Sequence, residues 1–125
     1  MHRVLVLGAG KIGALISGLL GESGDYEVQL ADVDGDLARS VALAHGLPGV
    51  EAYELDAGDA DQLASHLAAH PTDAIISGLP YFCNETVANA ARGAGCHYFD
   101  LTEDVAVTRA VRAIATGADT AFAPQ

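Results

Sequence analysis

The sequence is poor in aromatic and in basic residues. Tryptophan is absent and the aromatic share is only 6%, so the core should be built from aliphatic side chains. Six Lys and Arg stand against seventeen Asp and Glu, which gives a formal net charge of −11 at pH 7. A surface this acidic repels phosphate polyanions, and this argues against nucleic acid as a partner.

Cysteines and long apolar runs are also scarce. The two cysteines are Cys83 and Cys96, and their spacing matches neither a metal site nor a disulfide framework. Two reduced thiols are typical of a cytoplasmic protein. No segment approaches the roughly 20 apolar residues that cross a bilayer. Lys11 interrupts the apolar run near the N-terminus, and no small-residue cleavage site of a signal peptide follows. We therefore expect a cytoplasmic protein without a membrane partner.

Short apolar runs alternate with helical patterns along the chain. Its 125 residues, half of them apolar, are enough for one domain with a real core and too few for two. Because parallel strands need helical crossovers, the alternation predicts an α/β fold with a doubly wound parallel sheet, the Rossmann fold, with six strands in the order 3-2-1-4-5-6. The predicted strands are 3–8, 26–32, 50–55, 74–77, 97–100 and 120–123, and the clearest predicted helices are 36–45, 84–94 and 104–116.

A glycine motif lies at the first junction between a predicted strand and a predicted amphipathic helix. The run Gly8-Ala9-Gly10-Lys11-Ile12-Gly13 matches the pattern G-x-G-x-x-G. The first glycine permits a tight turn, the second lets a diphosphate approach the backbone, and the third allows close helix–strand packing. The partial positive charge at the helix N-terminus, about half an electron, favours the same anion. The motif therefore predicts a dinucleotide-binding site.

Asp32 lies nineteen residues beyond Gly13, at the end of the second predicted strand. A carboxylate at this place accepts hydrogen bonds from the adenosine ribose of NAD and repels the 2′-phosphate of NADP. The residues that follow, Val33, Asp34 and Gly35, add no positive charge. We therefore expect NAD to be preferred over NADP, with Val33 beside the cofactor. The alternative interpretation is that Asp32 only caps the next turn.

The ends of the later strands supply the remaining candidate residues. Asp56 and Ala57 follow the third strand, where the adenine would lie, although Asp56 is also placed to cap the next helix. The loop Ser77-Gly78-Leu79-Pro80 follows the fourth strand, and ligands in this fold bind near the reversal between strands one and four. We expect this loop to pass the pyrophosphate or the nicotinamide ribose. Lys11 could contact a phosphate or point to solvent.

The fifth strand is followed by a segment with two carboxylates, Asp100-Leu101-Thr102-Glu103. These side chains could reach the nicotinamide, but the favoured interpretation is that Thr102 or Glu103 caps the next helix. We therefore assign no catalytic residue. The five histidines are scattered and show no metal-ligand spacing, so no metal is expected.

Three segments together resemble a known family. Residues 4–13, 73–82 and 95–103 read VLVLGAGKIG, DAIISGLPYF and GCHYFDLTE. They resemble the N-terminal NAD(P)-binding domain of the saccharopine dehydrogenase-like oxidoreductases, a group that includes saccharopine reductases, lysine 6-dehydrogenases and carboxynorspermidine synthases. Many Rossmann proteins share the first segment, whereas HYFDLTE after a GLP loop is much more specific. The resemblance covers essentially the whole chain.

The resemblance implies hydride exchange between NAD(P) and a carbon–nitrogen bond of an amino acid. In such enzymes the Rossmann domain positions the cofactor, and a following α/β domain holds the amino-acid substrate and usually builds a dimer, so a homodimer is a candidate assembly. This chain stops at Pro124-Gln125, where the second domain would begin. We expect residues 1–125 to be one cofactor domain, part of a longer enzyme rather than a free-standing binding module. In either case it should bind cofactor without turning over substrate.

Two other function classes remain as alternatives. A regulatory nucleotide-sensing module, of the type attached to potassium transporters, also carries a first-turn glycine motif and an acidic residue after the second strand. The HYFDLTE segment argues against it. A short-chain or epimerase-type enzyme needs a Tyr-x-x-x-Lys pair near the fourth or fifth strand, and the only lysine here is Lys11.

Overall fold

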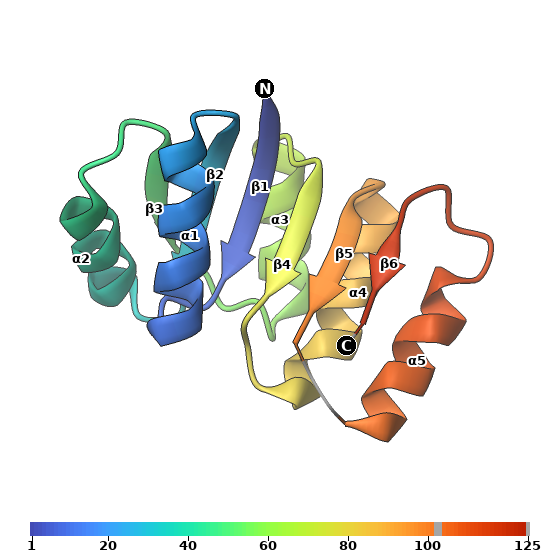
Figure 1. Cartoon of the computed structure of the whole chain (residues 1–125). Helices are drawn as coiled ribbons and strands as arrows, with labels where there is room; N and C mark the ends of the chain where they lie inside the picture. The colour runs from blue at the N-terminus through green and yellow to red at the C-terminus, as the bar shows by residue number, and fades with distance from the viewer. Residues whose placement is uncertain (102–103, 125) are drawn as a thin grey trace.

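The computed structural model describes residues 1–101 and 104–124. Strands and helices alternate from one end to the other (Figure 1). In chain order the elements are β1 (His2–Leu7), α1 (Lys11–Ser23), β2 (Tyr26–Asp32), α2 (Gly35–His45), β3 (Val50–Glu54), α3 (Ala60–Ala69), β4 (Ala74–Ser77), the short 3-10 helix η1 (Tyr81–Cys83), α4 (Asn84–Ala94), β5 (His97–Asp100), α5 (Val105–Ala115) and β6 (Phe122–Ala123). The bounds of β2, β4, β5 and α4 are those predicted from the sequence.

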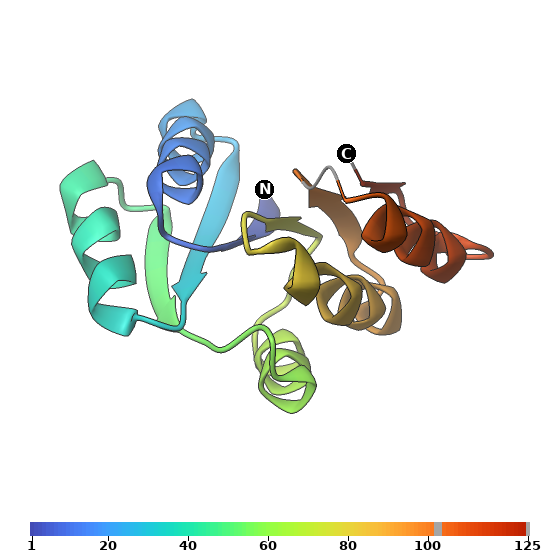
Figure 2. The same ribbon diagram turned by 90° about the horizontal axis from the view of Figure 1, so that it is seen from below.

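The strands form one parallel sheet in the order β3-β2-β1-β4-β5-β6. Helices α1 and α2 lie on one face, and α3, α4 and α5 lie on the other (Figure 2). The predicted doubly wound α/β fold and strand order are therefore confirmed. The order reverses between β1 and β4, so the two halves diverge there and leave a crevice at the carboxyl ends of these strands.

Two core clusters cover the two faces of the sheet. Along β1, Val4 and Val6 belong to the cluster under α1 and α2, whereas Leu5 and Leu7 belong to the cluster under α3, α4 and α5. All four side chains are at most 4% exposed. Side chains alternate along a strand, so a strand with helices on both faces needs apolar residues at every position. This accounts for the uninterrupted apolar run of β1.

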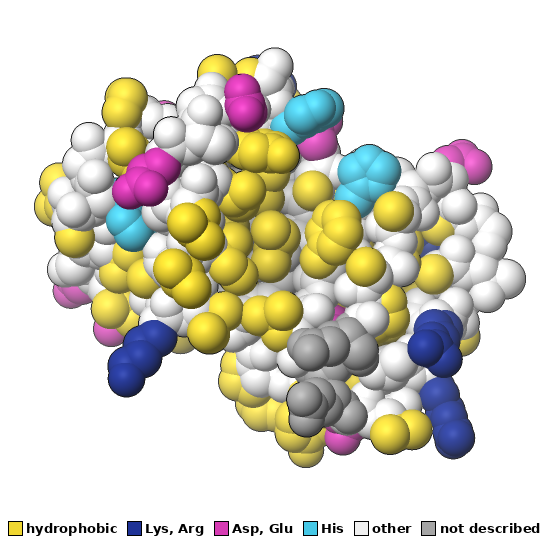
Figure 3. All heavy atoms as spheres, in the orientation of Figure 1, with side chains coloured by type: hydrophobic (Ala, Val, Ile, Leu, Met, Phe, Trp, Pro, Cys, Tyr) yellow, Lys and Arg dark blue, Asp and Glu magenta, His cyan; other side chains and the backbone are white. Residues whose placement is uncertain are grey.

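Helix α1 exists as predicted, but only part of its apolar stripe faces the core, where Ile16 and Leu20 are partly buried. Its buried residues are the small Gly13, Ser17 and Gly18, while Ile12, Leu15 and Leu19 are 51%, 57% and 60% exposed. A Cβ on Gly18 would lie 2.8 Å from the His45 ring of α2, so only a small residue fits there. Apolar side chains are accordingly gathered on this face, over α1 and the neighbouring strands (Figure 3).

The remaining differences from the sequence predictions are small. The sequence did not predict η1, and β6 spans only Phe122–Ala123. Helix α5 spans Val105–Ala115 with Thr116 as its C-cap, so it is one residue shorter at each end than the predicted helix 104–116. Cys83 and Cys96 are free thiols. In the described part of the chain, every helix is too short or too polar to cross a membrane.

Candidate functional site

The turn between β1 and α1 is formed by glycines that no larger residue could replace. Gly8 has φ +97°, and its N–H donates to the Ala31 carbonyl of β2 at 2.8 Å. A Cβ on Gly13 would lie 1.7 Å from the Gly8 carbonyl oxygen. The first turn of α1 therefore packs directly onto the backbone of the preceding turn, which requires glycine at both positions.

Gly10 differs from these two glycines because space is open beside it. A Cβ on Gly10 would meet no atom of the described residues within 4 Å. Gly10 is also the N-cap of α1, and in the described residues no side chain caps that helix. By contrast, α2, α3 and α5 begin with Asp34, Asp59 and Asp104, whose carboxylates accept first-turn N–H groups. The N-terminus of α1 thus keeps its backbone donors and its partial positive charge beside an open space, as an anion site requires.

Asp32 ties the glycine turn to the end of β2. Its Oδ2 accepts the Ala9 N–H at 2.8 Å, and its Oδ1 accepts the Asp34 N–H at 2.8 Å. Each oxygen keeps a further lone pair, so the half-buried carboxylate can still accept ribose hydroxyls. The turn-capping role and the ribose-binding role are therefore compatible in one side chain.

Further carboxylates surround this place. Glu54 of β3 is the register partner of Asp32, and its Oε1 would lie 2.8 Å from a Cβ on Gly35. The guanidinium of Arg39 also approaches Gly35, but it forms an ion pair with Asp36. Three acidic side chains besides Asp32 therefore lie in this region (Asp34, Asp36 and Glu54). The cation described beside them is Arg39, and it is already paired with Asp36.

The loop after β4 approaches the glycine turn from the other side of the crevice. The Gly78 N–H donates to the Leu7 carbonyl at 2.8 Å, and a Cβ on Gly8 would lie 3.3 Å from the Gly78 carbonyl oxygen. Ser77 is buried, and its hydroxyl donates to Asn84 Oδ1 at 2.6 Å. The predicted loop Ser77-Gly78-Leu79-Pro80 thus lies beside the first turn, with Ser77 fixed from below by α4.

A cavity of about 350 Å³ lies at this junction. It is lined by Ile12 of α1, by Ser77, Gly78 and Leu79 after β4, and by Tyr81 and Leu101. The structure therefore brings three predicted loop residues and one residue of the glycine motif to a common space. This is the region where the fold places a ligand between strands one and four.

The other residues predicted for the cofactor site lie at the carboxyl edge of the sheet, but they differ in the exposure of their side chains. Lys11 and Val33 are exposed, and Pro80 is exposed at the start of η1. Asp56 is exposed, and its Oδ1 accepts the Gly58 N–H at 3.0 Å, so it shapes the loop before α3, whereas the cap of that helix is Asp59 and not Asp56. Ala57 is 4% exposed and belongs to the core, so only its backbone could contact a ligand.

The end of β5 is more buried than the sequence suggested. Asp100 is 4% exposed and accepts a hydrogen bond from the Tyr98 hydroxyl at 2.6 Å. Burial, reinforced by the hydrogen bond and the charge of Asp100, raises the pKa of Tyr98, so the phenol stays a donor. Asp104 caps α5 by accepting the Val107 N–H. Thr102 and Glu103, the two caps predicted here, lie outside the described residues.

Sequence reasoning missed Asn84 as a residue of this site. Asn84 is 1% exposed, and its Nδ2 is the buried side-chain polar atom for which the described residues provide no partner. Its position at the first residue of a predicted helix gave no sign that it would hold Ser77. Burial and the nearby Asp56 carboxylate raise the pKa of the Cys83 thiol, which disfavours the thiolate.

In the described residues no cluster of His, Cys, Asp and Glu is arranged to hold a metal ion.

Comparison with protein families gives a match over most of the chain. A family model described as the saccharopine dehydrogenase NADP binding domain matches residues 4–121. This range contains the glycine turn, Asp32 and the loop after β4.

Solved structures of dehydrogenases share the fold. Apo saccharopine dehydrogenase (L-Glu forming) from Saccharomyces cerevisiae matches 99% of this chain with 27% of its own, at a TM-score of 0.85 and 22% identity. The WlbA dehydrogenase from Chromobacterium violaceum, in complex with NADH and UDP-GlcNAcA, matches 99% with 34% of its own, at 0.75 and 19% identity. WbmG from Bordetella bronchiseptica, in complex with NAD, matches 99% with 52% of its own, at 0.71 and 16% identity. The chain therefore spans about a quarter to a half of the length of these proteins.

Proposed function

This chain belongs to the saccharopine dehydrogenase NADP-binding domain family, and on that premise we propose that it is the dinucleotide-binding domain of an oxidoreductase acting on carbon–nitrogen bonds of amino acids. The observation that carries the proposal is the open space at Gly10, beside the uncapped N-terminus of α1. The bound nicotinamide would supply the hydride chemistry. The residues of this chain would bind and orient it.

The diphosphate would be held by the backbone of the glycine motif. The first-turn N–H groups of α1 provide donors, and Gly10 leaves room for the phosphate oxygens to approach them. Ala9 contributes through Asp32, which fixes the Ala9 N–H and thereby the shape of the turn. The contacts would come from backbone dipoles rather than from side-chain charge, so a net acidic surface is compatible with this site.

The adenosine end would favour NAD over NADP. Asp32 would accept the ribose hydroxyls, with Val33, Asp56 and Ala57 nearby at the ends of β2 and β3. A 2′-phosphate would meet Glu54 as well as Asp32, while Arg39 is held by Asp36. The family model is described as NADP binding, so the preference rests on these carboxylates alone.

The nicotinamide end would lie at the cavity between Ile12 and the loop Ser77-Gly78-Leu79-Pro80. Ser77 would be the positioning residue of this loop, because Asn84 fixes its hydroxyl and the Leu79 N–H approaches it at 3.4 Å. We assign no catalytic side chain to this edge.

The substrate would be bound outside this chain. The matched dehydrogenases are two to four times longer than the part they share with it. The exposed apolar side chains of α1 and of η1, such as Leu15, Leu19 and Phe82, are typical of a surface that contacts another domain. We therefore propose that the chain works within a longer, cytoplasmic, homodimeric enzyme, and that by itself it binds cofactor without turnover. The regulatory alternative receives no support from the dehydrogenase matches.

Equilibrium binding of NADH tests this proposal. We expect NADH to bind the purified chain with enhanced nicotinamide fluorescence, and Gly10→Val to weaken binding at least about tenfold by filling the space beside the turn. Gly93→Val in α4 is the matched control, because a Cβ there also meets no described atom within 4 Å. If neither NADH nor NADPH gives a response at millimolar concentration, the proposal is wrong.

A further inference from the structure

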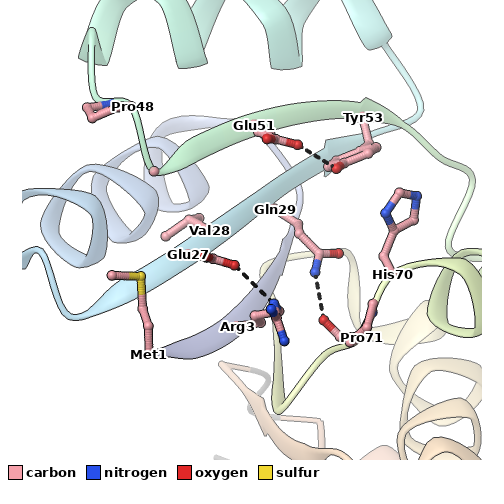
Figure 4. A pocket seen from close by; sticks show the side chains of 11 residues that line it. Met1, Arg3, Glu27, Val28, Gln29, Pro48, Glu51, Tyr53, His70 and Pro71 are labelled. Atoms are coloured by element: carbon pink, nitrogen blue, oxygen red, sulfur yellow. Dashed lines mark hydrogen bonds and ion pairs between the residues drawn. The ribbon is translucent and has the colours of Figure 1, made fainter.

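A second cavity opens at the opposite end of the sheet. Its volume is about 470 Å³, and it lies at the amino ends of β1, β2 and β3, bounded by the end of α3 (Figure 4). We call it the amino-edge basin. Arg3, Glu27, Gln29, Glu51 and Tyr53 line it together with His70. None of these residues belongs to the cofactor site described above.

Met1, Val28, Pro48 and Pro71 also line the basin, but the strand residues that line it from this face of the sheet are polar, whereas the face is elsewhere apolar. Arg3 and Leu5 point to the same side of β1, and Leu5 belongs to the core under α3. Gln29 is the register partner of Leu5, and Glu51 is the register partner of Gln29. A single row across three strands thus changes from an apolar residue to an amide and then to a carboxylate. Helix α3 covers the first of these and leaves the last exposed.

Gln29 forms a fixed floor. It is 8% exposed, its Oε1 accepts a hydrogen bond from His66 Nε2 at 2.7 Å, and its Nε2 donates to Thr72 Oγ1 at 3.2 Å. Both ends of the amide are therefore engaged, and the floor of the basin is held to α3 and to the segment before β4. A rigid floor lowers the conformational cost of binding a ligand above it.

Arg3 provides a site for an anionic group. Its Nε donates to Glu27 Oε2 at 3.0 Å, which fixes the plane of the guanidinium. Its two Nη atoms form no hydrogen bond with the described residues. The Nη edge of a guanidinium matches the two oxygens of a carboxylate. Arg3 is therefore oriented by one carboxylate and able to receive a second one from a ligand.

Glu51 provides a site for a cationic group on the opposite wall. Its Oε2 accepts the Tyr53 hydroxyl at 2.8 Å, while Oε1 has no partner recorded among the described residues. Burial, together with this hydrogen bond and the charge of Glu51, raises the pKa of Tyr53 to about 12, so the phenol remains a donor. The neighbouring rings of Tyr53 and His70, 4.8 Å apart, add an aromatic wall next to this carboxylate.

The two charged walls are separated by the width of β2. Figure 4 shows Arg3 and Glu51 on opposite sides of the basin with Gln29 between them. Two strand spacings of about 4.8 Å place the parent strands roughly 10 Å apart. A ligand that reaches both walls must carry its two charges several bonds apart. We propose that the amino-edge basin binds a small zwitterion whose carboxylate pairs with Arg3 and whose ammonium group pairs with Glu51.

Amide chemical shifts of the isotope-labelled chain test this inference with ε-aminocaproate as the probe. We expect the amides of Arg3, Gly49 and Glu51 to shift on titration. Caproate lacks the ammonium group and hexylammonium lacks the carboxylate, so each should bind about tenfold more weakly than the zwitterion. Glu51→Gln and Arg3→Gln should each cause a similar loss. Glu22→Gln on α1 and Arg109→Gln on α5, which remove exposed charges elsewhere, should leave the affinity unchanged.

Three results would overturn the inference. One is the absence of shifts at these amides, and another is equal affinity for ε-aminocaproate and hexylammonium. The third is an equal loss in the control variants, which would indicate diffuse attraction to an acidic surface rather than a site. A spectrum of each variant confirms folding, and Arg3→Lys, which keeps the charge but not the planar fork, replaces Arg3→Gln if that variant is unfolded. The shifts that NADH induces at Gly8 and Gly10 are measured separately, so this result does not depend on the cofactor proposal.

Discussion

The two edges of the sheet form ligand-sized spaces in opposite ways. At the carboxyl edge the space beside Gly10 exists because a side chain is missing, and the interactions available there come from backbone N–H groups. At the amino edge the space is bounded by charged side chains, with Arg3 on one wall and Glu51 on the other. The first edge suits a ligand recognised by its shape and its phosphates, and the second suits a ligand recognised by the positions of its charges.

The comparison also separates what is local in the sequence from what is not. The glycine turn at the centre of the carboxyl-edge site consists of six consecutive residues at one strand–helix junction, so its spacing is visible along the chain. The amino-edge basin depends on the register of three strands and on where α3 ends. No spacing rule connects Arg3 with Glu51, and only the folded sheet brings them to one cavity.

Gly13→Ala should have the largest effect on stability, because it disrupts the packing of α1 on the glycine turn at the carboxyl edge. The new Cβ would lie 1.7 Å from the Gly8 carbonyl oxygen, so backbone must move. We expect a loss of about 3 kcal/mol in the free energy of unfolding, measured by urea denaturation. Gly93→Ala, on an exposed position of α4, should stay within about 1 kcal/mol of the wild type. An unchanged midpoint for Gly13→Ala would mean that the helix does not pack on the turn as described.

Asp32→Ala should weaken NAD binding by roughly 1–3 kcal/mol, the scale of hydrogen bonds to a charged group. The variant loses the acceptor for the Ala9 N–H and the proposed acceptor for the ribose. Discrimination against NADP should relax at the same time. Calorimetric titration with both cofactors measures this, with Asp25→Ala, an exposed carboxylate before β2, as the control. Unchanged NAD affinity would show that Asp32 only caps the turn.

The free energy of unfolding of the chain should fall in mild acid because of His66, which lies at the amino edge. Burial, with a further contribution from His70, lowers the pKa of His66 to about 4. The unfolded chain, with an imidazole pKa near 6.5, takes up the proton first as the pH falls. Stability is therefore complete above about pH 6.5 and declines below it, by about 1.5 kcal/mol between pH 6.5 and pH 5. Denaturation of His66→Gln should show a smaller decline, and His2→Gln should follow the wild type. Parallel curves for the wild type and His66→Gln would contradict this assignment.

Asp36→Asn should have the smallest effect and sharpens the account of cofactor choice. The substitution releases Arg39 from its ion pair. We expect NADP affinity to rise about fivefold relative to NAD, within the range of exposed ion pairs. Asp61→Asn, at the corresponding first turn of α3, should leave the ratio unchanged. If the ratio is unchanged in Asp36→Asn as well, Arg39 does not reach the 2′ position.

Much of the fold was predictable because its signals are local. The strand order followed from alternating apolar runs and helical patterns, and Gly24, Gly46 and Gly95 mark helix ends where the structure has left-handed caps. The apolar spacing of α1 placed Ile16 and Leu20 against the core, but it did not show that the fully buried positions are small residues, which close packing against His45 selects at Gly18. The hydrogen bond between Ser77 and Asn84 was not predictable either, because no sequence pattern indicates that these two side chains meet.

The most direct test of the central claim is an amide-resolved titration of the labelled chain with NADH. The account predicts that the amides of Gly8, Gly10 and Gly13 shift strongly, together with Gly78 across the crevice, while Gly49 and Glu51 at the amino edge remain in place. Shifts confined to the amino edge, or no shifts at the glycine turn at saturating NADH, would contradict it.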